Sequence, residues 1–152
     1  MRIDLTWPEM LNAAITGVIR RMSSMDKGLN KNRHASKSDY QTDVTGAIAE
    51  ACFAKFMDHY WSCSVNTFKA PDVGDWQVRS TEYRDGHLIV RPNDRDGERV
   101  AFLVVDGFGA TLIGWISVAD AKVKCFWREE CNSWWVPQDA LAPFDEQIAH
   151  PA

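Results

Sequence analysis

The chain has 152 residues, of which 45% are hydrophobic and 25% are charged. This length suits one domain with one core, and the composition excludes collagen-like, coiled-coil and largely disordered chains. No apolar run approaches the roughly 20 residues that cross a bilayer, and the first residues include acids where a signal peptide would be apolar. We therefore expect one cytoplasmic domain over residues 1–152 with no membrane partner.

The four cysteines do not follow the spacing of a metal site. Cys52, Cys63, Cys125 and Cys131 form no Cys-x-x-Cys pair, and no histidine stands where it would complete a zinc site. We expect reduced thiols that pack in or near the core.

The first predicted element is a helix over residues 6–25. Thr6 is a suitable N-cap, Pro8 suits the first turn, and Glu9 completes a capping box. Apolar residues then recur at steps of three and four: Met10, Leu11, Ala14, Ile15, Val18, Ile19 and Met22. This pattern predicts an apolar stripe that packs on the body of the domain.

Residues 26–41 are polar and basic, and they predict a loop. The net charge of −4 hides an excess of basic over acidic residues in positions 1–40, seven against four. A solvated loop is one interpretation. The other is an arm that contacts DNA phosphates through Lys27, Lys31, Arg33 and Lys37.

A second helix is predicted from Asp43 to about Tyr60, and it is apolar nearly all the way round. Glu50 lies within this buried helix, on the side that also carries small residues such as Gly46 and Ala47. Burying an unpaired charge is costly, so the Glu50 carboxylate must have a partner.

The pattern changes to strands after residue 60. Stretches rich in β-branched and aromatic residues, separated by turn formers, predict strands at 62–68, 76–83, 87–91, 100–105 and 111–117. A helical turn at 120–122, an edge strand at 134–136 and a short helix at 144–148 follow. Trp127 and Trp134 predict a hairpin, with a base-stacking platform as the alternative. The fold class is therefore α+β, with a central mixed sheet of about five strands flanked by helices.

The segment 70–80 carries the residues that could do chemistry. In a strand that begins near Trp76, Gln77 and Arg79 lie on one face. A turn brings Asp72 and Asp75 to the head of this strand. An acid, an amide and a guanidinium can thus converge.

These motifs resemble the PD-(D/E)XK nuclease-like superfamily, whose pattern is a helix glutamate, an aspartate and a (D/E/Q)-x-K strand motif. Gly46-x-x-x-Glu50, Pro71-Asp72 and Gln77-x-Arg79 match that pattern. The predicted elements over 42–117 fit its α-β-β-β core followed by further strands. The stretch from Val44 through 88–92 and 114–116 also resembles small phage and actinobacterial members.

The resemblance implies a restriction-endonuclease-like core with an extra N-terminal helix, and a metal-dependent nuclease acting on DNA in the cytoplasm. Mg²⁺ or Mn²⁺ would be held by Glu50, Asp72, Gln77 and the carbonyl of Val78, all hard oxygen ligands. Arg79 would orient the phosphate. Pro71-Asp72 matches the motif better than Asp75, and a homodimer is possible because many such nucleases pair.

Two departures from the superfamily pattern leave a second interpretation open. Gln77 stands in the place of an acid, and Arg79 stands in the place of the lysine. Arginine stays protonated, so it cannot act as a general base. Glu50 could then simply pair with Arg79, and the aspartates could be turn formers. On this alternative the chain is a catalytically silent binding or interaction protein, encoded by a phage or serving a phage or its host.

Overall fold

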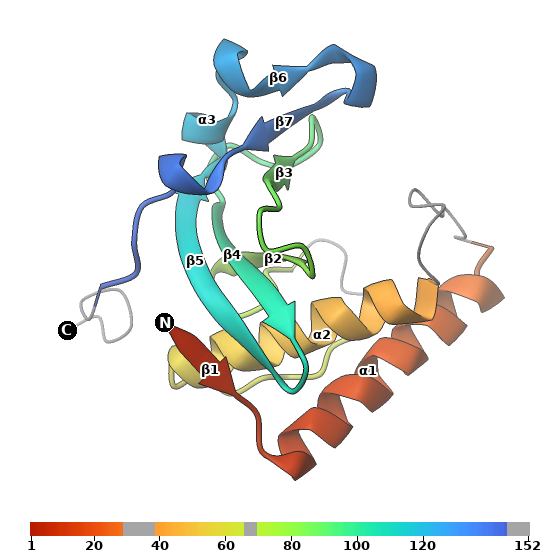
Figure 1. Cartoon of the computed structure of the whole chain (residues 1–152). Helices are drawn as coiled ribbons and strands as arrows, with labels where there is room; N and C mark the ends of the chain where they lie inside the picture. The colour runs from red at the N-terminus through yellow and green to blue at the C-terminus, as the bar shows by residue number, and fades with distance from the viewer. Residues whose placement is uncertain (29–38, 66–69, 146–152) are drawn as a thin grey trace.

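The protein is described by a computed structural model that covers residues 1–28, 39–65 and 70–145 (Figure 1). The helices are α1 (Trp7–Asp26), α2 (Asp39–Phe56) and α3 (Val118–Ala121). The strands are β1 (Arg2–Asp4), β2 (Trp76–Thr81), β3 (Leu88–Val90), β4 (Arg99–Asp106), β5 (Gly109–Ser117), β6 (Trp127–Arg128) and β7 (Ser133–Val136). The α+β class predicted from the sequence is confirmed.

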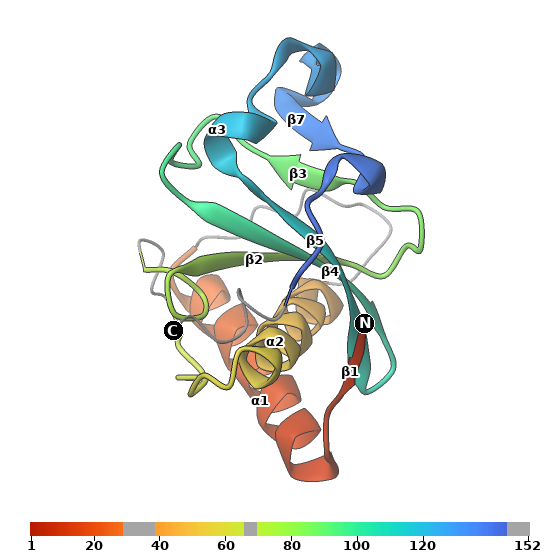
Figure 2. The same ribbon diagram turned by 90° about the vertical axis from the view of Figure 1, so that its left-hand side faces the viewer.

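The elements stack in layers around the long β4–β5 hairpin. A four-stranded mixed sheet has the order β1-β5-β4-β2, with β2 parallel to β4 and the other pairs antiparallel. Helix α2 contacts this sheet, and α1 contacts α2 from outside (Figure 2). A second sheet of three strands, β3-β7-β6, lies at the other end of the molecule.

The single five-stranded sheet predicted from the sequence is therefore wrong in one respect. Strand β3 leaves the main sheet and pairs with β7. This places a separate apolar cluster, which includes Leu88, Val90 and Phe102, on the face of β4 opposite α2. Two cores thus share one hairpin, because β4 is buried on both faces.

Helix α1 begins as predicted. The Thr6 backbone N–H and hydroxyl donate to the Glu9 carboxylate at 2.6 and 2.8 Å. The prediction that its apolar stripe packs on the domain is wrong, however. The buried residues are Ala13, Thr16 and Gly17. Of the predicted stripe, Met10 packs against the core, but Leu11, Ile15, Val18, Ile19 and Met22 are exposed. Small side chains allow a closer approach to α2 than the predicted stripe would.

Helix α2 is shifted toward the N-terminus relative to the predicted span. It begins at Asp39, inside the predicted loop, where Arg21 pairs with Asp39 and Asp43 at 3.4 and 2.8 Å. It ends at Phe56 because Asp58 adopts a left-handed conformation with φ 51°. The His59 and Asp58 N–H groups then bond back to the carbonyls of Ala54 and Lys55, which closes the helix.

Two other expectations need correction or lie partly outside the described residues. Residues 62–65 form no strand, and the rest of the predicted strand 62–68 is not described. Phe144 and Asp145 are not helical, and the remainder of 144–148 is not described. The hairpin at Trp127 and Trp134 is confirmed, since β6 pairs with β7 and the two rings lie 4.7 Å apart.

All four cysteines are free thiols, as expected, but of the four only Cys52 is buried; Cys63 is half-buried, and Cys125 and Cys131 are exposed. Within the described part of the chain, no helix has the combined length and apolar character needed to cross a membrane.

Candidate functional site

Glu50 is buried in α2, with only 7% of its surface exposed, and its charge partner is Arg20. The two terminal nitrogens of Arg20 donate to the two carboxylate oxygens of Glu50, both at 2.7 Å. This bidentate geometry is the strongest form of guanidinium–carboxylate pair. The alternative partner considered from the sequence, Arg79, bonds instead to the Val78 carbonyl and to Asp94.

The surroundings of this pair add further hydrogen bonds to both partners. Arg20 donates its Nε–H to the Ser64 carbonyl at 2.8 Å, and the Trp61 indole N–H donates to Glu50 Oε2 at 3.2 Å. Burial opposes the charged guanidinium, but the hydrogen bonds and charge of Glu50 raise the pKa of Arg20 above its usual value. The pair therefore ties α1, α2 and the segment after α2 together.

Asp72 lies at the free edge of β2, where it is partly buried. Its Oδ2 accepts the Val78 N–H at 2.8 Å, and its own N–H donates to the Trp76 carbonyl. Burial, and next the negative charge of Glu50, raise the pKa of Asp72 to about 6, although the Val78 N–H, Arg79 and Arg20 act in the opposite direction. Asp72 and Glu50 are thus close enough to repel each other.

Arg79 reaches the same edge of the sheet. Its Nη1 donates to the Val78 carbonyl at 3.4 Å, and its Nη2 pairs with Asp94 at 3.3 Å. Its positive charge also acts on Asp72. Arg79 leaves β2 on the same face as Gln77, opposite the main core, so it acts on Asp72 through its charge and not through a bond. The structure therefore gathers Glu50, Asp72 and Arg20, two acids and one guanidinium group, and we call these three residues the edge cluster.

Gln77 does not belong to the edge cluster. Trp76 and Val78 face α2 in the main core, so alternation along β2 turns Gln77 to the opposite face of the sheet. There its amide donates to Glu98 at 3.3 Å. The expectation that it would complete a shell with Glu50 is not met by this geometry. Asp75 is also outside, since it is exposed and pairs with Arg99.

The arrangement does not offer the ligand set that the resemblance implies for Mg²⁺ or Mn²⁺. Both oxygens of Glu50 are bonded to Arg20, Gln77 points away, and the Val78 carbonyl accepts from Arg79. Over the described ranges, no group of three or more His, Cys, Asp or Glu residues is placed to share a metal ion. A cation at Glu50 and Asp72 would require Arg20 to leave.

Of the predicted phosphate-binding arm, Lys31, Arg33 and Lys37 lie outside the described residues, and Lys27 caps the C-terminal end of α1. The arm therefore stays a prediction.

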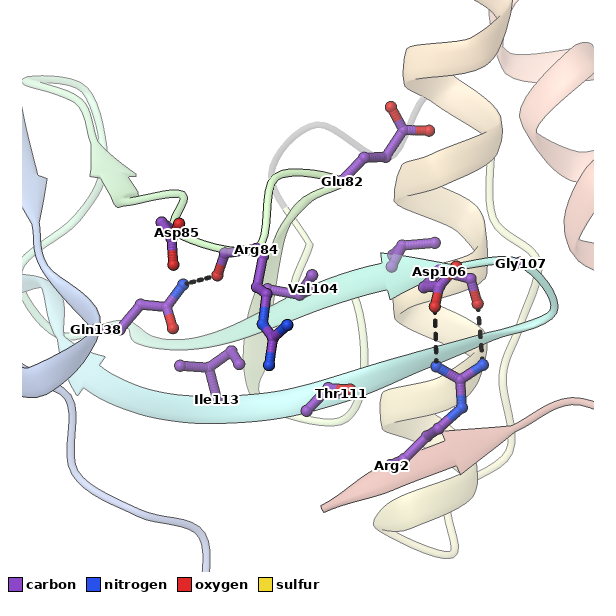
Figure 3. Close-up of a pocket in the computed structure, with 11 residues that line it drawn as sticks. Arg2, Glu82, Arg84, Asp85, Val104, Asp106, Gly107, Thr111, Ile113 and Gln138 are labelled. Atoms are coloured by element: carbon purple, nitrogen blue, oxygen red, sulfur yellow. Dashed lines mark hydrogen bonds and ion pairs between the residues drawn. The ribbon is translucent and has the colours of Figure 1, made fainter.

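A second concave surface lies on the face of the main sheet away from α2 (Figure 3). It is a cavity of about 740 Å³ whose floor includes Val104, Thr111 and Ile113. Two arginines on its rim are Arg84, next to the acidic Asp85, and Arg2, which bonds to Asp106. The rim thus mixes both charges and has no arrangement of acid, base and nucleophile.

Arg20 and Trp61, which bond to Glu50 in the structure, were not predicted from the sequence. Arg20 is thirty positions away from Glu50 on another helix. Its position on the polar side of α1 gave no signal of a buried partner.

Comparison of the chain with family models, with curated proteins and with solved structures finds no match. A function for this chain therefore depends on the geometry described above.

Proposed function

We propose that the chain is a PD-(D/E)XK-like protein that serves as an interaction module and does not cleave DNA. The observation that carries this proposal is the bidentate pair between Arg20 and Glu50. A metal-binding carboxylate needs free oxygens, whereas this one is neutralised by a guanidinium and further bonded to Trp61. Glu50 then acts as a structural link between two helices.

Two further features support the loss of metal chemistry. Gln77, in place of an acid, is turned to the other face of the sheet. Arg79, in place of lysine, is held by Asp94 and cannot accept a proton near neutral pH. The nuclease-like core itself is part of the proposal. It is supported by a buried helix that carries Glu50 and precedes an edge strand with Asp72 at its head.

One observation favours a second candidate, a metal-dependent phosphodiesterase acting on DNA. Glu50 lies close enough to Asp72 for its negative charge to raise the pKa of Asp72. Two carboxylates that repel each other are a common starting point for cation binding, because a cation relieves the repulsion. On this candidate Asp72 and Glu50 would bind Mg²⁺ or Mn²⁺, and Arg79 would contact the phosphate.

A cleavage assay separates the two candidates. Supercoiled plasmid and short duplex and single-stranded oligonucleotides are incubated with the wild type and with Asp72→Asn, each with Mg²⁺, with Mn²⁺ and with chelator. If the chain is an interaction module, the wild type shows no more metal-dependent cleavage than Asp72→Asn. Cleavage by the wild type that disappears in Asp72→Asn would reject the module and establish the phosphodiesterase.

A further inference from the structure

The outer face of α1 carries a row of large, exposed apolar side chains, of which Met25 is contacted by the Tyr40 hydroxyl at one end of the row. Leu11 and Ile15 are each 48% exposed, Met22 is 58% exposed and Met25 is 48% exposed. Val18 and Ile19 lie between them and are exposed to 37% and 46%. A surface helix of a monomer would normally present charged or polar residues here.

The spacing of this row is that of a helix-pairing seam. Leu11, Ile15, Val18, Met22 and Met25 follow one another at alternating steps of four and three. This gives an average period of about 3.5 residues, the repeat that keeps a seam facing a second helix along its whole length. The opposite face of α1 is already used, because Ala13, Thr16 and Gly17 are buried there.

The size of the exposed surface matches what a stable dimer needs. Beyond the row, Trp7 is 67% exposed and packs its ring against Phe108, which is 47% exposed, at a centroid distance of 5.7 Å. Together these eight side chains expose on the order of 800 Å², about the area that each partner buries in a standard protein interface. The largest apolar patch of a typical monomer is smaller, about 300–600 Å².

The composition of the chain favours a second copy as the occupant. Residues 29–38, which follow α1, include one large apolar residue, Leu29, among polar and basic ones. Such a segment does not match a row of this length. The five seam residues are uncharged, and the two arginines that lie between them in the sequence, Arg20 and Arg21, pair with acids of α2. Two identical seams therefore meet without repulsion.

We propose that two copies of this chain pair through the outer faces of α1 in an antiparallel arrangement about a two-fold axis. Leu11 then faces Met22 of the partner subunit, and Ile15 faces Val18 of the partner subunit, so each large residue meets another. The antiparallel direction also places Asp26, at the negative end of α1, beside the positive end of the partner helix. This pairing is independent of whether the chain cleaves DNA.

Sedimentation equilibrium of the full chain over a wide concentration range tests the interface. We expect a reversible dimer for the wild type, and Leu11→Lys should weaken it by at least about 100-fold because it buries a charge against Met22 of the partner subunit. Tyr60→Lys is the matched control: Tyr60 is 91% exposed, lies outside α1 and should leave the dimer unchanged. Circular dichroism of each variant shows that it is folded.

The direction of pairing is tested by combining Leu11→Lys with Met22→Glu. In the antiparallel dimer the two introduced charges are opposite and face each other, so association should recover part of the loss and become sensitive to salt. In a parallel dimer like charges would meet, and association should weaken further. A wild type that is monomeric at every concentration, or a Tyr60→Lys variant weakened as much as Leu11→Lys, would overturn the interface.

Discussion

At the scale of single residues, the pair between Arg20 and Glu50 has the largest structural consequence. A buried ion pair stabilises a fold little compared with an apolar pair of similar volume, but removing one partner leaves an uncompensated charge. Here the charge left behind would be a carboxylate only 7% exposed in the middle of α2. Both partners of the pair are therefore needed for α1 to pack on α2.

We expect Arg20→Ala to lower the free energy of unfolding by about 3–5 kcal/mol, since Glu50 would lose both of its charged hydrogen bonds. The double variant Arg20→Met with Glu50→Leu should recover most of that loss, because neither charge remains. Asp75→Ala, which breaks an exposed pair with Arg99, should change stability by less than about 1 kcal/mol. Urea unfolding of the wild type, the two single variants and the double variant checks this order of stabilities. An Arg20→Ala variant as stable as Asp75→Ala would contradict it.

Asp72 gives a prediction for pH. Its pKa is raised from the ordinary 3.8 to about 6, so the folded state binds the proton more tightly than the unfolded chain. Stability from this group is therefore present below about pH 4 and is lost as the pH rises through about 6, by about 2–3 kcal/mol. Glu9 has the opposite sign, because its pKa is lowered to about 2 by Lys55 and the Thr6 N–H, so its contribution is lost below about pH 4.

The variant Asp72→Asn isolates this effect, because asparagine can still accept the Val78 N–H through its amide oxygen. It should be more stable than the wild type at pH 7.5, and the difference should vanish near pH 4. Urea unfolding at a series of pH values measures the difference. A constant difference across the series would mean that Asp72 is not in the environment described.

At the scale of elements, the contact between α1 and α2 depends on a glycine. A Cβ added to Gly17 would lie 2.5 Å from the Cα and 2.7 Å from the N of Val44, which is α2 backbone and cannot move aside by a rotamer change. The close approach that buries Glu50 against Arg20 therefore requires a residue without a side chain at position 17.

We expect Gly17→Ala to destabilise the protein by about 1–3 kcal/mol through overpacking at this contact. Gly46→Ala is a matched control within α2: nothing lies within 4 Å of an added Cβ there. It should stabilise the protein by about 0.5–1 kcal/mol, because alanine restricts the unfolded chain. Thermal and urea unfolding of the two variants test these expectations. A change in stability of the same sign in Gly17→Ala and Gly46→Ala would contradict the described packing.

The elements also show which parts of the fold follow from sequence. The start of α1 is local chemistry between Thr6 and Glu9, and it was predictable. The direction of the apolar stripe of α1 was not, because periodicity finds an apolar face without saying whether it meets the core or another chain. The three-residue strand β1 is formed only by pairing with β5, so its sequence carries no signal of its own.

Some features of the candidate site could likewise be predicted from the sequence, and others could not. The burial of α2 and the need of Glu50 for a partner followed from the composition of that helix. Which arginine would supply the partner depended on how α1 crosses α2, a non-local contact. The position of Gln77 was predictable from alternation along β2, but the face on which α2 would pack was not.

At the scale of the whole molecule, the β4–β5 hairpin joins two cores. Leu103 belongs to the core under α2, whereas its neighbour Phe102 belongs to the core under β3 and β7. Because both cores share this strand, the two sheets are expected to unfold together as one cooperative unit.

We therefore expect Phe102→Ala and Leu103→Ala to destabilise one common transition, by about 3–5 and 2–5 kcal/mol respectively. Far-ultraviolet circular dichroism, which reports mainly on α1 and α2, and tryptophan fluorescence, which includes Trp134 and Trp135 of the small sheet, should give coincident unfolding curves in both variants. Separate transitions in Phe102→Ala would show that the small sheet folds on its own.

On the proposed function, the edge cluster is a structural link and not a metal site. The melting temperatures of the wild type and Asp72→Asn, each with Mn²⁺ raised from zero to millimolar concentration, test it most directly. We expect equal shifts for the two proteins, because neither binds the ion at this cluster. A wild type whose melting temperature rises by about 5–10 °C at 100 times the dissociation constant, with no such rise in Asp72→Asn, would contradict it.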